Sequence, residues 1–170
     1  MPNPIYGYFK GVKQGEMAGF GSWPGEDDQK GREKSCLIMQ FEHLVKVPFD
    51  IHSGQASGKR LHGPVRIVKR IDKASPLLYQ ALCSNEGLSE CKFKWYRNDP
   101  TGAGGQKHYF STELEQAVLV EIKQWFPLTA DLTRQNYSHF EECAFKYRKI
   151  TWRWEDGGVT TMDDWQAADE

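Results

Sequence analysis

A mainly β fold with one α-helix is what this sequence predicts. Short blocks in which apolar and polar residues alternate recur along the chain, and glycine-rich or polar turns separate them, as half-buried strands require. Aromatic residues make up 13% of the 170 residues, a share that favours β structure. A chain of this length can build one substantial core, and no repeat or low-complexity linker interrupts it. We therefore expect a single domain over residues 1–170.

The N-terminal half contributes three expected strands, 5–9, 36–47 and 65–71. The first and third are short and are bounded by Gly, Pro or polar residues. In the second, apolar residues alternate with polar ones such as Gln40 and Glu42, so the two kinds should project to opposite sides. The apolar face of this strand should carry Leu37, Met39, Phe41, Val45 and Val47.

One helix is indicated at residues 75–83. Ser75 can serve as its N-cap, with Asp72 as a competing cap, and Pro76 stands in the first turn, where no backbone N–H is needed. Gly87 suits a C-terminal stop. The apolar residues repeat at helical spacing and form one stripe, which more often packs on a core than holds a cofactor. These residues are Leu77, Leu78, Ala81 and Leu82.

Three further strands are expected at 90–97, 108–113 and 117–125. Phe93 and Trp95 alternate with lysines in the first of them. In 117–125 the residues also alternate between two faces. One face carries Val118, Val120 and Ile122, and the other carries Leu119, Glu121 and Lys123.

The last expected strand is 140–154. Phe145 and Tyr147 should lie on one face, yet the other face is not polar either. Its apolar residues are Ala144, Ile150, Trp152 and Trp154. A strand that is apolar on both faces suggests a second surface that covers it, such as a subunit interface.

The charge balance argues against a polyanionic partner. Lys+Arg (22) nearly cancel Asp+Glu (23), and the net charge of −1 supplies no field that would hold the protein on nucleic acid. The basic pairs Lys59-Arg60 and Lys69-Arg70 are expected on a solvated face. The N-terminus has no apolar region of signal-peptide length, and no apolar stretch reaches the roughly 18 residues of a membrane helix. We expect a soluble protein that is made in the cytoplasm.

Residues that could hold a metal or a cofactor lack ligand spacing. Cys36, Cys83, Cys91 and Cys143 form no C-x-x-C pair, and the five histidines match no zinc or haem pattern. We expect no metal site, no cofactor and reduced thiols that are mostly buried.

Catalytic patterns find little support. The segment GQASGKR looks like a phosphate loop, but Gly54 and Gly58 are one residue too close, and Arg60 stands where Ser or Thr would bind magnesium. Glu113 and Glu115 would share a strand face at about 6 to 7 Å, near a glycosidase separation, although a solvent-facing pair is the commoner explanation. The histidines lack an evident catalytic nucleophile beside them. We expect no enzyme, and a hydrolase is the weakest alternative.

A set of segments matches a known family in order and spacing. They are PFDIHSGQASGKRLHGP (48–64), IDKASPLLY (71–79), FKWYR (93–97), YFSTELE (109–115), YRKITW (147–152) and DDW (163–165). Together they resemble the haemolysin-coregulated protein (Hcp) family over about residues 36–165. The segment 15–35 departs from the resemblance.

The resemblance implies two packed antiparallel sheets closed into a β-barrel with one α-helix alongside. It implies hexameric rings that stack as the inner tube of a type VI secretion system and carry small effector proteins in the lumen, with sheath and spike proteins as further partners. No catalytic residue and no membrane insertion are implied, and export through the apparatus would need no signal peptide. Five residues follow Trp165, too few for the C-terminal effector domain of some relatives.

A monomeric β-barrel that binds a small apolar ligand is the alternative function, since the same strand pattern would serve it. Interior packing separates the two functions, because large inward side chains would fill a small barrel. Those side chains are Phe93, Trp95, Phe145 and Tyr147.

The loop 48–63 is predicted to contact the next ring of such a stack. It is longer than ordinary hairpin connections, and loops of this size are usually functional or disordered. Its basic pair could meet the acidic segments 26–28 or 163–164 of a neighbour, a contact worth at most about 1 kcal/mol. A solvated loop that touches nothing is the alternative. The residues assigned to this contact are Ser53, Gly54, Ser57, Gly58, Lys59 and Arg60.

Overall fold

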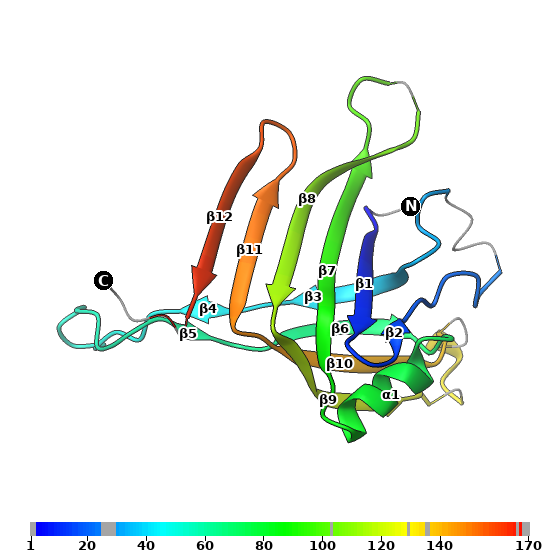
Figure 1. The fold of residues 1–170 in the computed structure, drawn as a ribbon, viewed down its shortest axis with the longest axis horizontal. Helices are drawn as coiled ribbons and strands as arrows, with labels where there is room; N and C mark the ends of the chain where they lie inside the picture. Colours follow the sequence, from blue (N-terminus) through cyan, green and yellow to red (C-terminus); the bar gives the residue numbers. More distant parts are fainter. Residues whose placement is uncertain are drawn as a thin grey trace.

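The computed structural model describes residues 3–24, 30–102, 104–128, 130–134, 137–165 and 167. It is mainly β with one α-helix, as predicted (Figure 1). The elements are β1 (Ile5–Gly11), β2 (Gly15–Glu16), β3 (Cys36–Glu42), β4 (Val45–Lys46), β5 (Leu61–His62), β6 (Val65–Arg70), α1 (Ser75–Cys83), β7 (Gly87–Asn98), β8 (Gln106–Glu115), β9 (Ala117–Trp125), η1 (Leu132–Arg134), β10 (Phe140–Lys146), β11 (Lys149–Trp154) and β12 (Val159–Asp164).

Strands β7, β9, β10, β6, β3 and β1 follow one another around a closed barrel, because β1 pairs with β3 on one side and with β7 on the other. Closure leaves these strands without an open edge. Strands β8, β11 and β12 continue the sheet outward from β7, as Figure 1 shows. The short strands β4 and β5 pair only with each other among the described strands and form a ribbon that leaves the barrel.

The barrel interior is filled by aromatic side chains. The ring of Phe9 lies 5.2 Å from that of Phe145 in a stacked arrangement and 5.7 Å from that of Phe93 edge to face. All three side chains are fully buried, and Phe93 and Phe145 face inward as the alternation predicts. Burying a side chain of this size contributes about 1.5 to 3 kcal/mol. This packing speaks against a ligand cavity inside the barrel.

Helix α1 spans the predicted residues, but its capping residues differ from the predicted ones. The N-cap is Ala74 rather than Ser75, and Asp72 Oδ1 accepts a hydrogen bond of 2.9 Å from its backbone N–H. The C-cap is Ser84, and Asn85 then takes a positive φ of 52° that turns the chain. Gly87 does not stop the helix, because it already begins β7.

The segment 36–47 is not one strand. A β-bulge between Ile38 and Gln40 shifts the alternation, so Cys36 and Ile38 point inward while Met39 is exposed. The predicted apolar face was therefore wrong for its first half. The chain then leaves the barrel after Glu42, which explains why its last apolar residues are also exposed.

The segment 140–154 is also two strands, not one. A turn between β10 and β11 places Tyr147 and Ile150 in the same core as Phe145. Part of the second apolar face is therefore covered within the chain. The sequence pattern did not predict β12, because its side chains are mostly exposed and show little apolar alternation. In β9 the inward residues begin with Ala117 and Leu119 rather than with the valines.

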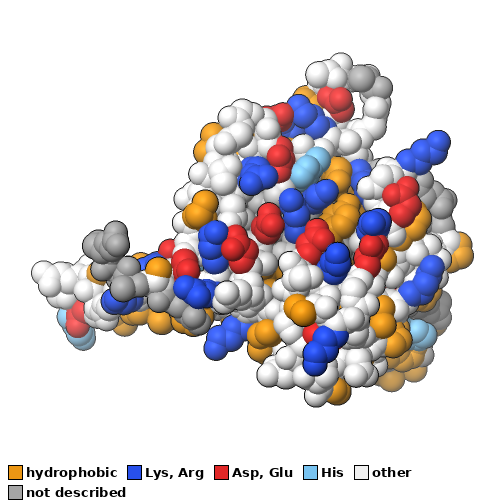
Figure 2. All heavy atoms as spheres, viewed as in Figure 1, with side chains coloured by type: hydrophobic (Ala, Val, Ile, Leu, Met, Phe, Trp, Pro, Cys, Tyr) orange, Lys and Arg blue, Asp and Glu red, His pale blue; other side chains and the backbone are white. Residues whose placement is uncertain are grey.

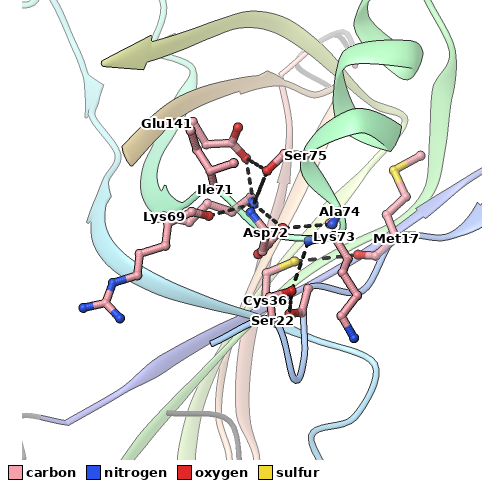
Figure 3. Close-up of polar contacts among 12 residues, drawn as sticks. Met17, Ser22, Cys36, Lys69, Ile71, Asp72, Lys73, Ala74, Ser75 and Glu141 are labelled. Carbon is pink, nitrogen blue, oxygen red and sulfur yellow. Dashed lines mark hydrogen bonds and ion pairs between the residues drawn. The ribbon is translucent and has the colours of Figure 1, made fainter. Parts of the chain in front are cut away.

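A buried ion cluster joins α1 to the barrel (Figure 3). Lys69, expected on a solvated face, is 0% exposed, and its Nζ lies 2.7 Å from Asp72 Oδ1 and 2.7 Å from Glu141 Oε1. Ser75 Oγ donates a hydrogen bond of 2.7 Å to Glu141. Burial alone would lower the pKa of Lys69, but the neighbouring Cys36, Asp72 and Glu141 raise it above its ordinary value. The cluster ties β6 and β10 to the residues that begin the helix.

Candidate functional site

Residues 45–62, which we call the arm, project beyond the barrel (Figures 1 and 2). The pairs Val45↔His62 and Lys46↔Leu61 join its two strands, and a further bridge joins Phe49 to Ala56. The arm is thus a two-stranded ribbon for part of its length, with an ordered turn at its end.

The turn at the arm tip is built around Asp50. Its Oδ1 accepts hydrogen bonds from the backbone N–H groups of Ser53 at 2.8 Å and His52 at 2.7 Å, which lower the pKa of this carboxyl. Gly54 has a φ of 69°, a backbone conformation that glycine adopts without strain. The tip therefore has a defined conformation despite its small residues.

The outgoing side of the arm presents a row of exposed apolar side chains. Val45, Val47, Phe49 and Ile51 follow at every second position, and Ile51 is 86% exposed. Leu61 on the returning side is also exposed. Apolar groups gathered in this way usually mark an interaction surface. The alternation was visible in the sequence, but Val45 and Val47 were assigned to a core strand.

The residues that were predicted to contact the next ring lie in two places, along the arm and at its base. Ser53, Gly54, Ser57, Gly58 and Lys59 lie along the arm and are exposed. Arg60 lies at the arm base, where it contacts the chain's own last strand. The structure therefore brings the first five residues to the projecting part of the arm and separates Arg60 from them.

Arg60 forms an ion pair with Asp163 of β12, with 2.5 Å between Nε and Oδ2. The pKa of Asp163 is lowered, first by the hydrogen bond from Arg60 and then by that from His62. Such a pair was predicted between two rings, but this ion pair forms within one chain. The other acidic segment considered, 26–28, lies outside the described residues.

A row of hydrogen bonds continues inward from this ion pair. His62 Nε2 lies 2.6 Å from Asp163 Oδ2, and His62 Nδ1 lies 2.8 Å from the hydroxyl of Tyr147. The same hydroxyl lies 2.6 Å from His43 Nε2. Trp165 donates its indole N–H to the backbone oxygen of Tyr147 at 2.6 Å, and its ring stacks on His62. We call His43, Tyr147, His62 and Asp163 the histidine row.

A shallow, mainly apolar pocket of about 310 Å³ lies beside the histidine row. Its lining consists of His62, Gly63, Pro64, Val120, Lys146, Tyr147 and Trp165. The Lys146 ammonium lies 5.9 Å from the centre of the Trp165 ring. The arm base therefore combines an apolar hollow with a buried polar network.

A second exposed apolar group lies where β9 and β10 meet their connecting loop. Its described members are Trp125, Phe126, Leu128, Leu132 and Tyr137. Trp125 and Phe126 line an open hollow of about 260 Å³ together with Ile71, Gln124 and His139. This end of the barrel is distant from the arm (Figure 1).

Segment 15–35, which departs from the family resemblance, packs on the barrel through those of its residues that the structure describes. The Arg32 guanidinium lies between the rings of Tyr6 and Tyr96, 4.4 and 3.8 Å from their centres, and donates to Gln106. Trp23 donates its indole N–H to the backbone oxygen of Ile71 at 2.9 Å. These contacts give the segment a structural role.

The carboxylates considered for catalysis have ordinary partners. Glu115 pairs with Lys149 at 2.8 Å, and Glu113 approaches Lys92 at 3.7 Å. The adjacent Glu141 and Glu142 of β10 differ in exposure, Glu141 being buried and Glu142 half-buried. Within the described part of the chain, no cluster of three or more His, Cys, Asp or Glu residues could hold a metal ion, and no helix there is long and apolar enough to cross a bilayer.

Comparison with known proteins agrees with this architecture. Residues 8–154 match the family model described as "Type VI secretion system effector, Hcp". The chain is 40% identical to the "Major exported protein" of Pseudomonas aeruginosa over 171 residues, which cover 98% of each protein.

Solved structures agree in the same way. A crystal structure of an Hcp protein superposes with a TM-score of 0.87 at 30% identity, covering 98% of this chain and 99% of the other. The secreted protein Hcp3 of Pseudomonas aeruginosa gives a TM-score of 0.77 at 38% identity, with 97% and 99% covered. The family match over most of the chain, the identity over nearly all of it and the shared barrel lead to one conclusion: this chain belongs to the Hcp family of type VI secretion system proteins.

Proposed function

We propose that the protein is a structural subunit of the type VI inner tube, in which six copies form a ring and rings stack through the arm. The observation that carries this proposal is the row of apolar side chains on an ordered, projecting arm, which the chain itself does not cover. Fully burying one such side chain contributes about 1.5 to 3 kcal/mol. An arm that is already ordered loses little conformational entropy when it docks.

The position of the arm supports a head-to-tail contact. It projects from one end of the subunit, where it can reach a surface of a second copy other than that copy's own arm (Figure 1). Contacts of this kind generate closed rings or open stacks, depending on whether the rotation closes. The exposed apolar group near Trp125 and Phe126 supplies a second surface for contacts within the ring.

Export and cargo belong to the same proposal. The relative named "Major exported protein" supports a subunit that leaves the cell through the apparatus. Small effector proteins would travel in the lumen, and sheath and spike proteins would contact the tube. Side chains of both signs are interspersed on the face in Figure 2, without a large field of one sign. Catalysis, cofactors, nucleic acid and membrane insertion have no part in the proposal, and the whole chain, residues 1–170, acts as one domain.

Native mass spectrometry and negative-stain microscopy test the proposal. The wild-type protein should give six subunits and rings that stack at high concentration. The double variant Phe49→Ser, Ile51→Ser should keep its rings and lose their stacks, as should replacement of residues 53–60 by a Gly-Ser linker. Val12→Ser, which removes an exposed valine away from the arm, is the matched control and should stack like the wild type.

Each contrary outcome has a distinct meaning. A wild-type protein that stays monomeric at high micromolar concentration would overturn the proposal and favour the ligand-binding barrel. Stacks that persist in both arm variants would remove the arm from the contact. Loss of the rings themselves would assign the arm to the interface within a ring.

A further inference from the structure

The histidine row joins four separate parts of the chain through three hydrogen bonds. His43 follows β3 and His62 belongs to β5, so the two histidines stand on either side of the arm base. Tyr147 lies in the turn between β10 and β11, and Asp163 belongs to β12. The row thus fastens both ends of the arm to the body of the protein. The side chain of His62 is only 1% exposed, so bulk water cannot readily replace these bonds.

When both histidines are neutral, one arrangement of protons satisfies all three hydrogen bonds of the row. With both histidines neutral, His62 Nε2–H donates to the Asp163 carboxylate, and its bare Nδ1 accepts from the Tyr147 hydroxyl. The oxygen of Tyr147 then accepts from His43 Nε2–H. Burial and the charge of Asp163 raise the pKa of Tyr147, which keeps its hydroxyl protonated. Every donor in the row has an acceptor.

One added proton is also accommodated. A charged His62 donates with both ring nitrogens, to Asp163 and to the oxygen of Tyr147. The Tyr147 hydroxyl then donates to His43 Nε2, and His43 keeps its proton on Nδ1. The two bonds to Tyr147 have exchanged donor and acceptor, the bond from His62 to Asp163 keeps its direction, and each bond again has one donor and one acceptor.

A second proton cannot be accommodated. With both histidines charged, two N–H groups point at the Tyr147 oxygen, and the hydroxyl proton has no acceptor within the row. The two positive rings would lie with their centres 6.4 Å apart. Burial lowers the pKa of His43, and repulsion from His62 lowers it further. Both effects disfavour the doubly charged row.

The other charged groups around the row do not remove this conflict. Asp163 is the anion of the row, and it already pairs with Arg60. Lys146, on the Tyr147 side, adds positive charge beside Trp165. Asp164 on β12 pairs with Arg148 at 3.1 Å. Because the pKa of Asp163 is lowered, its carboxylate stays charged over the range in which histidines titrate.

We propose that the histidine row is a proton-sensitive latch, which holds the arm base against β12 while the two histidines share at most one proton and releases it when both are charged. The release itself does not depend on the role of the arm, whereas its effect on ring stacking rests on the function proposed above. The direction of the pH dependence follows from the linkage between histidine protonation and opening of the arm base. A histidine that is kept neutral in the closed form stabilises that form above about pH 6.5, the ordinary value. Below that pH the ratio of closed to open form falls by about tenfold per unit until the closed form itself takes up the proton.

Hydrogen-exchange mass spectrometry on the full-length protein tests the latch, with rates corrected for the intrinsic effect of pH. In the wild type, protection of peptides covering 44–47 and 60–63 should fall at least tenfold between pH 7.5 and pH 5, while peptides covering 88–97 in the barrel keep theirs. Glutamine at position 43 can donate or accept but cannot become charged, so His43→Gln should abolish the fall. His139→Gln removes an exposed histidine at the other end of the barrel and should leave the fall intact. Tyr147→Phe should lower protection of the arm base at both pH values.

Unchanged protection of the wild-type arm base between the two pH values would overturn the latch, as would a fall that persists in His43→Gln. Native mass spectra at both pH values separate this result from the proposed function. If the arm base opens at low pH while ring stacking is unaffected, the latch is supported and the arm is removed from the stacking contact. Stacking that depends on pH while the base stays protected overturns the latch alone.

Discussion

Lys69 and Glu141 form an ion pair in which both side chains are 0% exposed, with 2.7 Å between Nζ and Oε1. Charges in this position stabilise the fold only as a matched set, because each has lost its water. The pair therefore gives a sharp test of how the barrel and helix α1 are joined.

Glu141→Gln should lower the free energy of unfolding by about 3 to 5 kcal/mol, since it leaves the Lys69 ammonium with Asp72 as its remaining carboxylate. Urea titration at neutral pH measures the change. Glu142→Gln on the half-exposed face of the same strand breaks a pair with Arg66 and should cost at most about 1 kcal/mol. Equal costs for the two variants would contradict the burial of the cluster.

Phe93→Ala should cost about 3 to 5 kcal/mol, because it opens a cavity among rings that fill the barrel. Phe49→Ala removes the same atoms from a side chain that is 65% exposed on the arm. It should change stability by no more than about 0.5 kcal/mol. Thermal and urea unfolding of the two variants, side by side, separate core packing from the assembly surface.

Asp163→Asn should destabilise the protein at pH 7 by about 1 kcal/mol, a modest value because Arg60 and Asp163 are about a quarter exposed. The pKa of Asp163 is lowered in the folded state, so its contribution is present above the unfolded value of about 4. That contribution disappears as pH falls through the folded value. Urea titrations at pH 7 and at about pH 2.5 should show a difference in stability between wild type and variant that is smaller at the lower pH. A difference that grows on acidification would show the opposite sign.

Cys83 should be the thiol that reacts in the native protein. It is exposed on α1, whereas Cys36, Cys91 and Cys143 are buried, and burial raises the pKa of each of these three. Titration with a chromogenic disulfide reagent should modify about one thiol per chain rapidly, and all four after denaturation. Cys83→Ser should abolish the rapid phase. Fast reaction of a second thiol would show that the barrel opens locally.

Local patterns in the sequence were sufficient for much of the fold. Alternation predicted the strands at 90–97 and 117–125, flanking Gly, Pro and polar residues indicated those at 5–9 and 65–71, and the spacing of apolar residues predicted the helix at 75–83. These features depend on neighbours within a few residues, so they can be read along the chain. The segments 48–64 and 163–165, with the others in order, were likewise sufficient to indicate the family.

Only the tertiary structure decided how those elements meet. It closed the barrel between β1 and β7, bent the chain near Tyr147, and buried Lys69 against a carboxylate far along the sequence. It also placed Arg60 on Asp163, 103 residues away, and gathered the histidine row from both sides of the arm. No periodic pattern in the sequence reveals which partner a charged or titratable residue will contact. The favourable energy comes from a contact that exists only after distant strands pair. For that reason the sequence alone determined most of the elements and the family, while the ion pairs, the histidine row and the exposed face of the arm required the folded chain.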